Sequence, residues 1–163
     1  MAVIGDVDEA NSLIGVALLH VSADAPRAML SRIQNEMFDL GADLATPGSD
    51  FAPTEMSLRI VASQIARLER EIDMMNEMLA PLRSFILPGG GSGAAYLHLA
   101  RATVRRAERA AVAATAAVAL NPLALAYINR LSDHLFVLAR AVAVEAGGDI
   151  LWQPGATRDS PQE

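Results

Sequence analysis

The sequence has 163 residues, enough for one domain with a substantial core, and its formal net charge is −6. The acidic balance makes nucleic acid a poor partner, and the absence of cysteine and lysine excludes disulfides, thiolate chemistry, Schiff bases and a P-loop nucleotide site. Hydrophobic residues make up 52% of the chain but aromatic residues only 4%, so alanine, leucine and valine must fill the core, which favours closely packed helices.

Neither a metal centre nor a membrane segment is predicted. The three histidines, His20, His98 and His134, are isolated rather than spaced as ligands, so each is expected to be a partly buried structural residue. The N-terminus lacks a basic region followed by an apolar stretch, and the longest apolar run, residues 110–120, is too short to cross a bilayer. The expected location is the cytoplasm.

Three helices are predicted in the first half of the chain. The first contains Asp6, Asp8 and Glu9, which are expected in its first turn at the positive end of the helix dipole, and it ends before the breaker cluster at residues 22–26. The second is expected from about residue 26 to 44, because proline suits the first turn of a helix. After a loop at residues 45–53, the third is expected from 54 to 79, with alternating charges on its solvent face.

The fourth predicted helix follows three consecutive glycines and extends from about residue 92 to 120, with four arginines within nine residues. Arg101, Arg105 and Glu108 lie at i, i+4, i+7 spacing and therefore share one face. Guanidinium groups are charged planar forks that suit phosphate oxygens, although a solvated face on which Glu108 pairs with its arginine neighbours is the alternative. The preceding glycine turn favours a site, because glycine lets a backbone approach a ligand closely.

The fifth predicted helix begins at an Asn-Pro cap and ends at about residue 145, before two glycines. Asn129, Asp133, Phe136 and Arg140 share one of its faces, a pattern more typical of a buried polar network than of a site. The tail from about residue 154 is expected to be flexible. The predicted fold is all-α, an up-and-down five-helix bundle that forms a single domain over residues 1–163.

Six ordered blocks of the sequence resemble the PduO-type ATP:cob(I)alamin adenosyltransferases and cover nearly the whole chain. The blocks are GDVDEANSLIG (5–15), IQNEMFDLGADLATP (33–47), LRSFILPGGG (82–91), HLARATVRRAER (98–109), NRLSDHLFVLAR (129–140) and LWQPG (151–155). The resemblance implies a homotrimer with active sites between subunits. It also implies transfer of the 5′-deoxyadenosyl group of ATP to a Co(I) corrinoid such as cobalamin, with triphosphate released and Mg²⁺ accompanying the nucleotide.

The resemblance assigns ATP-binding roles to four residues. Arg105 and Arg106 match residues that hold the triphosphate and neutralise charge on the leaving group. Asn129 matches an asparagine that contacts the nucleotide near its adenosine end. Glu108 matches an acid of the same site that orients the arginines.

Three further residues match positions at the edge of the family's site. Asp8 and Arg101 match a pair that forms a salt bridge across the subunit interface. Phe85 matches an aromatic residue that fills the space below the corrin ring and excludes the lower axial ligand, which makes Co(II) easier to reduce; without the resemblance this phenylalanine would be assigned to the core. A corrinoid reductase and an adenosylcobalamin-dependent enzyme are implied as protein partners.

One departure from the family leaves two functions open. Family members carry a nucleotide-binding segment resembling T-R-x-G-D-x-G-x-T upstream of the GDVDEANS block, whereas this sequence starts only four residues before that block. The chain is therefore expected to be either an adenosyltransferase with a clipped start or a trimeric corrinoid-binding or delivery protein that has lost ATP binding. The intact Arg105, Arg106, Glu108 and Asn129 favour the enzyme, because a site without function has no physical reason to keep buried charge.

Overall fold

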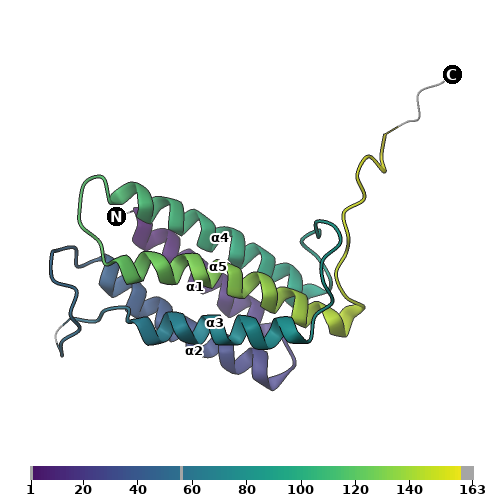
Figure 1. Ribbon diagram of the computed structural model, residues 1–163, viewed down its shortest axis with the longest axis horizontal. Coiled ribbons are helices and arrows are strands. Elements are labelled where there is room, and N and C mark those ends of the chain that lie inside the picture. The colour runs from purple at the N-terminus through teal and green to yellow at the C-terminus, as the bar shows by residue number, and fades with distance from the viewer. Residues whose placement is uncertain (1, 56, 159–163) are drawn as a thin grey trace.

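The computed structural model describes residues 2–55 and 57–158, in which five α-helices form one bundle (Figure 1). The helices are α1 (Ala2–Leu19), α2 (Asp24–Leu44), α3 (Ala62–Glu77), α4 (Ser92–Ala114) and α5 (Pro122–Ala143), and a short 3-10 helix, η1 (Val144–Ala146), follows α5. Successive helices run in opposite directions in Figure 1. The predicted all-α, five-helix architecture is confirmed, and no helix in this part of the chain is long and apolar enough to cross a membrane.

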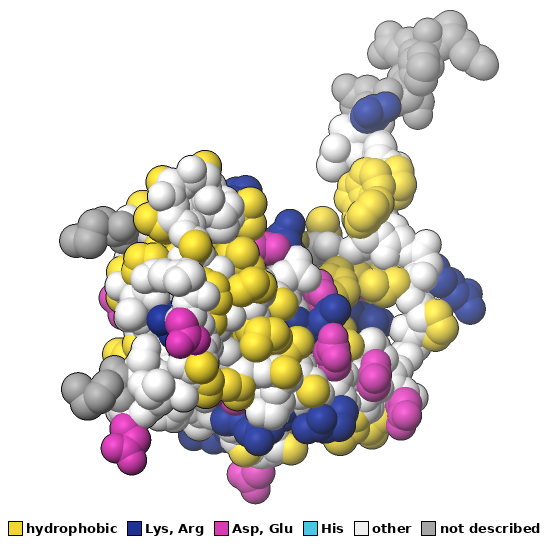
Figure 2. All heavy atoms as spheres, turned by 60° about the vertical axis from the view of Figure 1, so that its left-hand side comes forward, with side chains coloured by type: hydrophobic (Ala, Val, Ile, Leu, Met, Phe, Trp, Pro, Cys, Tyr) yellow, Lys and Arg dark blue, Asp and Glu magenta, His cyan; other side chains and the backbone are white. Residues whose placement is uncertain are grey.

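The core depends on close approach between α1 and α4. Helix α4 lies between α1 and α5, while α2 packs on α1 and α3 packs on α5. Ala10 and Ala17 of α1 and Ala100 and Ala107 of α4 are buried, and such small side chains let two helices approach closely. The composition-based expectation of a core rich in alanine, leucine and valine is confirmed. Figure 2 shows acidic and basic side chains mixed along the lower and right-hand part of one face, beside a group of hydrophobic side chains.

The prediction that the third helix begins at residue 54 is wrong. Residues 58–61 are not helical, because Arg59 is buried and donates hydrogen bonds to Asp43 Oδ1 and to the Thr46 carbonyl, each at 2.7 Å. The backbone N–H of Ile60 donates to Asp43 Oδ2 at 2.8 Å. These bonds tie the segment to the end of α2, and helix α3 begins only at Ala62.

Two other helical predictions also require correction. Helix α4 ends at Ala114 rather than near residue 120, because the next residues form tight turns and the Ala119 carbonyl accepts a hydrogen bond from Gly48 N–H at 3.1 Å. Helix α1 has no acidic residue in its first turn, so Asp6, Asp8 and Glu9 do not act on the helix dipole there. The expected start of α5 is confirmed, since the Asn121 side chain accepts a hydrogen bond from the N–H of Leu123.

The expectations of a flexible tail and of partly buried histidines are confirmed only in part. Residues 154–158 are exposed, and the rest of the tail that was expected to be flexible, residues 159–163, lies outside the described residues. His98 and His134 are buried, as expected. His20 is instead exposed and stacks on Tyr96, with 4.8 Å between the ring centroids.

A polar network inside the bundle joins α2, α3 and α5. Glu71 Oε2 accepts a hydrogen bond from Arg32 Nη2 at 2.9 Å and lies 2.7 Å from Nε2 of His134. Beside it, the Tyr127 hydroxyl donates to Glu36 Oε2 at 2.8 Å. Burial acts to raise the pKa of Glu71, but the hydrogen bonds of His134 and Arg32, together with the charge of Arg32, outweigh burial and lower the pKa to about 2.

Replacing Glu71 by glutamine is therefore expected to remove a stabilising contribution that depends on pH. Because the pKa is lowered in the folded state, the carboxylate stabilises the fold above about pH 4.5 and loses this effect as the pH falls towards 2. We expect the free energy of unfolding of the wild type to exceed that of Glu71→Gln by about 1–3 kcal/mol at pH 7, after allowance for solvent screening. This difference should shrink below pH 4.5. Urea unfolding across this range measures it. Glu69→Gln, on the exposed face of α3, is the control, and parallel pH profiles for wild type and Glu71→Gln would contradict the expectation.

Candidate active site

The side chain of Glu108 joins α4 to α5. Its Oε2 forms an ion pair with Nη1 of Arg105, one turn earlier on α4, and its Oε1 accepts a hydrogen bond from Asn129 Nδ2 of α5 at 2.8 Å. The Glu108 side chain is only 14% exposed, whereas that of Arg105 is 46% exposed. A largely buried carboxylate thus fixes two exposed polar groups, one from each helix.

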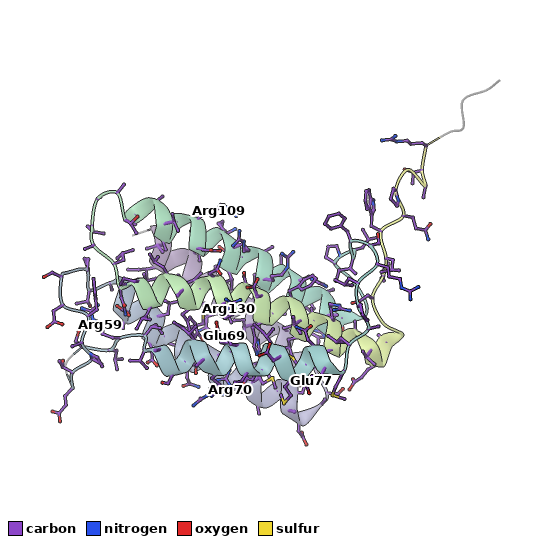
Figure 3. All side chains as sticks on the ribbon, viewed as in Figure 1. Arg59, Glu69, Arg70, Glu77, Arg109 and Arg130 are labelled. Carbon is purple, nitrogen blue, oxygen red and sulfur yellow. The ribbon has the colours of Figure 1, made fainter. Side chains whose placement is uncertain are left out.

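This arrangement presents hydrogen-bond donors and an acceptor side by side. Arg105 uses Nη1 for Glu108, so its remaining N–H groups can meet an anion. Asn129 donates through Nδ2, which leaves Oδ1 free to accept a hydrogen bond. Arg109, labelled on α4 in Figure 3, donates to the Arg105 carbonyl at 3.2 Å and adds positive charge to the same side. The cluster suits a molecule that carries both phosphate groups and hydrogen-bond donors.

Arg106 faces a different helix from Arg105. Its Nε donates to Asp6 Oδ1 at 3.0 Å and its guanidinium forms a second ion pair with Glu9, both on α1. These hydrogen bonds, first that of Glu9 and then that of Asp6, raise the pKa of Arg106. Neighbouring residues of a helix point about 100° apart, so the two arginines do not converge within one chain. Sequence reasoning missed the partnership of Arg106 with Asp6 and Glu9.

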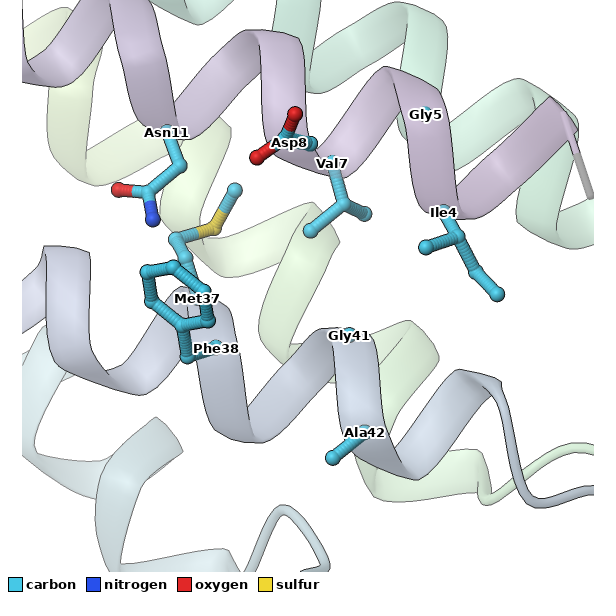
Figure 4. A pocket seen from close by; sticks show the side chains of 9 residues that line it. All are labelled: Ile4, Gly5, Val7, Asp8, Asn11, Met37, Phe38, Gly41 and Ala42. Atoms are coloured by element: carbon cyan, nitrogen blue, oxygen red, sulfur yellow. The ribbon is translucent and has the colours of Figure 1, made fainter.

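Asp8 and Arg101 do not meet within the chain. Arg101 lies one turn before Arg105, and its Nε is buried without a hydrogen-bond partner among residues 2–55 and 57–158. Asp8 lies at an open groove of about 430 Å³ between α1 and α2 (Figure 4). The groove is lined by Ile4, Gly5, Val7, Asp8, Asn11, Met37, Phe38, Gly41 and Ala42. Most of its lining is apolar, and Phe38 is 73% exposed.

An apolar hollow lies at the other end of the α4–α5 face. Phe85, from the segment between α3 and α4, is 77% exposed, and its ring stands edge-on to Trp152 with 6.0 Å between centroids. Phe136 of α5 lines the same hollow and packs edge-on against His98 of α4. Along α4, Arg101 follows His98 by one turn and precedes the Glu108 cluster. The hollow and the cationic cluster therefore lie along the α4–α5 pair.

The surroundings of His98 keep its ring neutral near pH 7. Burial and then the charge of Arg101 lower the pKa of His98. A neutral imidazole next to Phe136 preserves the apolar character of the hollow.

The glycine turn before α4 packs against protein rather than bordering an open site. Gly90 and Gly91 have φ angles of +86° and +95°, a conformation that side chains disfavour. A Cβ on Gly90 would lie 2.8 Å from the Cβ of Ala143 and 3.2 Å from the carbonyl of Gly148. The glycines thus allow a close approach to the end of α5, not to the cationic cluster.

The face that was predicted to carry a buried network on α5 is divided into separate pairs. Asn129 bonds to Glu108, Asp133 pairs with Arg130 at 3.0 Å on the surface, and Arg140 pairs with Asp149 at 2.9 Å. Arg130 also lies 3.3 Å from Glu69 of α3, and both are labelled in Figure 3. Only Arg140 among these is buried, so the prediction of one buried network is wrong.

Comparison with known proteins gives consistent matches. The sequence profile of the family described as cobalamin adenosyltransferase matches residues 1–142. A corrinoid adenosyltransferase of Mycobacterium leprae (strain TN) is 47% identical over 155 residues, which cover 92% of this chain and 80% of the relative. The corrinoid adenosyltransferase of Bacillus subtilis (strain 168) is 40% identical over 159 residues, covering 93% and 79%.

Solved structures show the same likeness. A variant PduO-type ATP:corrinoid adenosyltransferase from Lactobacillus reuteri, complexed with cobalamin and ATP, has a TM-score of 0.83 at 34% identity and covers 93% of this chain and 84% of that one. A second variant from the same organism, complexed with ATP, has a TM-score of 0.84 at 35% identity, with coverage of 93% and 85%.

Proposed function

The chain belongs to the cobalamin adenosyltransferase family, and from this membership we propose that it transfers the 5′-deoxyadenosyl group of ATP to a Co(I) corrinoid. The electron pair of Co(I) attacks C5′ and forms the Co–C bond, while the C5′–O5′ bond breaks and its electron pair leaves with the triphosphate. Because the reacting cobalt belongs to the substrate, the protein acts by positioning and electrostatics. The relatives are themselves corrinoid adenosyltransferases, which does not favour a carrier that lacks ATP binding.

The observation that carries the proposal is the link from Arg105 through Glu108 to Asn129. The free donors of Arg105 would bind the triphosphate and stabilise the negative charge that grows on it as the bond breaks. The free Oδ1 of Asn129 would accept a hydrogen bond from the adenosine part of ATP. Glu108 holds both groups at once, so the nucleotide would meet a preorganised pair rather than two mobile side chains.

Arg106 is proposed as a second triphosphate contact, although it bonds to α1 within one chain. To reach the nucleotide it must exchange Asp6 and Glu9 for phosphate oxygens. Its side chain is 43% exposed, so this exchange takes place close to solvent and requires no burial of an unpaired charge.

The hollow at Phe85 is proposed to receive the corrin ring. Its lining from Phe85, Ile86 and Phe136 suits a flat and largely apolar macrocycle. Phe85 would occupy the space below the cobalt and exclude the lower axial ligand, which favours reduction to Co(I). Its high exposure in the free protein is consistent with a surface that a ligand covers.

Mg²⁺ is proposed to arrive with the nucleotide rather than to occupy a protein cage. The described part of the chain contains no group of three or more His, Cys, Asp or Glu side chains that could hold a metal ion. Phosphate oxygens are the usual ligands of nucleotide-bound Mg²⁺, and the arginines of the cluster offer donors rather than metal ligands. A reductase that supplies Co(I) and an enzyme that uses adenosylcobalamin are the proposed protein partners.

We propose a homotrimer in which Asp8 of one subunit pairs with Arg101 of the next. Residues 1–163 of each subunit are proposed to form a single domain. Arg101 has a buried Nε without a partner among the described residues, and a carboxylate from another subunit would satisfy it. The apolar groove beside Asp8, with the exposed Phe38, offers a surface for a second copy. The pairing would place the subunit boundary beside the cationic cluster on α4.

We expect the protein in solution to have three times the 17.2 kDa mass of one chain. Replacing Asp8 by asparagine should weaken assembly by about 2–5 kcal/mol per contact, because Arg101 would stay partly buried and unpaired. Light scattering over a range of micromolar concentrations measures the mass in solution and how strongly the subunits assemble. Asp24→Asn, an exposed change on α2, is the control, and a monomer at every concentration would contradict the shared-site arrangement.

The test of the proposed function uses chemically reduced cob(I)alamin with and without ATP. An adenosyltransferase should convert the corrinoid to a light-sensitive alkylated product and release one triphosphate for each product formed. A corrinoid carrier would bind the corrinoid but release no triphosphate. Binding without turnover by the protein would therefore contradict the proposal.

A further inference from the structure

The segment that carries Phe85 is paired with the segment that follows η1. Leu87 N–H donates to the Ile150 carbonyl and Trp152 N–H donates to the Phe85 carbonyl, both at 2.8 Å. Ile86 and Leu151 form an isolated antiparallel bridge between these bonds. Figure 1 shows the two segments together at one end of the bundle. We call residues 84–87 and 149–152 the ribbon.

The ribbon has little apolar burial of its own. Leu87, Ile150, Leu151 and Trp152 are all between 44% and 49% exposed. A two-stranded pairing is at best marginally stable in water without further packing. Its position on the bundle must therefore depend on a small number of anchoring contacts.

Arg140 supplies an anchor for both strands. Its side chain is buried in the last turn of α5, where Nε donates to Asp149 Oδ2 at 2.9 Å and Nη2 donates to the Ala80 carbonyl at 2.7 Å. Ala80 leads into the strand with Phe85, and Asp149 begins the strand with Trp152. One planar guanidinium thus reaches both acceptors from two separate nitrogens, a geometry that the single nitrogen of lysine does not reproduce.

We propose that Arg140 is a positioning residue for the corrinoid, acting through Asp149 and the Ala80 carbonyl to hold Phe85 in the hollow. The inference rests on the proposed function, since that function gives Phe85 its place below the cobalt. The Phe85 ring stands edge-on to Trp152 of the ribbon and otherwise borders the open hollow that Phe136 also lines, so its position depends on how the ribbon backbone is held. Arg140 does not touch the corrinoid itself.

Arg140 lies far from the proposed ATP contacts, so its replacement should affect corrinoid binding rather than ATP binding. Arg140 follows Asn129 by eleven residues on α5, a distance of about 16 Å along the helix axis. Loosening the ribbon should therefore raise the KM for the corrinoid and leave the KM for ATP alone. A purely structural role in the bundle would affect both substrates together.

The kinetic test uses Arg140→Lys and Asp149→Asn, the second of which keeps the buried arginine and changes only its largely buried carboxylate partner. Each is expected to raise the KM for chemically reduced cob(I)alamin about tenfold and to change the KM for ATP by less than about twofold. Glu145→Gln is the matched control, because Glu145 accepts an exposed hydrogen bond from Ser22 at the same end of the molecule. In a Phe85→Ala background the effect of Arg140→Lys should disappear, since neighbouring residues that act together are not additive.

A second readout needs no substrate. Trp152 is the single tryptophan of the chain, so all tryptophan emission reports on the ribbon. Acrylamide should quench this emission more strongly in Arg140→Lys and Asp149→Asn than in wild type or Glu145→Gln. Unchanged quenching, equal changes in both KM values, or full additivity with Phe85→Ala would each overturn the inference. Failure of the proposed function would appear separately, as an unsubstituted protein that forms no adenosylated corrinoid.

Discussion

Replacing Arg105 by lysine is expected to lower the rate of adenosyl transfer by at least about a hundredfold, nearly as much as replacement by alanine. Glu108 holds the Arg105 guanidinium beside Asn129, so its free N–H groups form a preorganised fork. Lysine keeps the charge but loses the fork and its two-point hydrogen bonding. Because the charge on the departing triphosphate is greatest in the transition state, turnover should fall along with ATP affinity.

Single-turnover adenosylation of chemically reduced cob(I)alamin measures this effect directly. Arg70→Lys is the matched control, since Arg70 is an exposed arginine of α3, a helix that packs on α5 and takes no part in the cationic cluster. We expect that control to remain within about threefold of wild type. Near-normal turnover by Arg105→Lys would mean that the fork is unimportant and that Arg105 is a solvated surface charge.

Replacing Asp43 by alanine is expected to destabilise the fold by about 3–5 kcal/mol. The Asp43 side chain is fully buried and accepts hydrogen bonds from Arg59 at 2.7 Å, Ile60 N–H at 2.8 Å and Asn121 Nδ2 at 2.7 Å. Its removal leaves the buried Arg59 charge without its ion-pair partner and two further donors unsatisfied. The same change frees the non-helical segment before α3 from the end of α2.

Urea unfolding at pH 7 provides the free energy of unfolding, and the slope with denaturant checks that the folded state stays compact. Asp39→Ala, one turn earlier on α2, is the control and should change stability by no more than about 0.5 kcal/mol. A loss below 1 kcal/mol for Asp43→Ala would show that solvent or a rearranged loop replaces the missing carboxylate.

The sequence alone was sufficient for the elements whose signals are local. Helix α2 and the start of α5 were predicted to within two residues, because proline and the Asn121 cap act on the backbone next to them. The start of α3 was not, since the non-helical segment before it depends on the bond from Arg59 to Asp43, sixteen residues away on another helix. The early end of α4 likewise involves a bond between Gly48 and Ala119.

In the candidate site, too, some relationships follow from the sequence and others only from the tertiary structure. Helical spacing alone places Arg105 and Glu108 on one face, because 3.6 residues per turn is a property of the backbone. The partners of that face depend on how helices rotate and pack, so only the tertiary structure brings Asn129 to Glu108 and turns Arg106 towards Asp6 and Glu9. Relationships within one helix follow from local geometry, whereas those between helices follow from packing that no short stretch of sequence encodes.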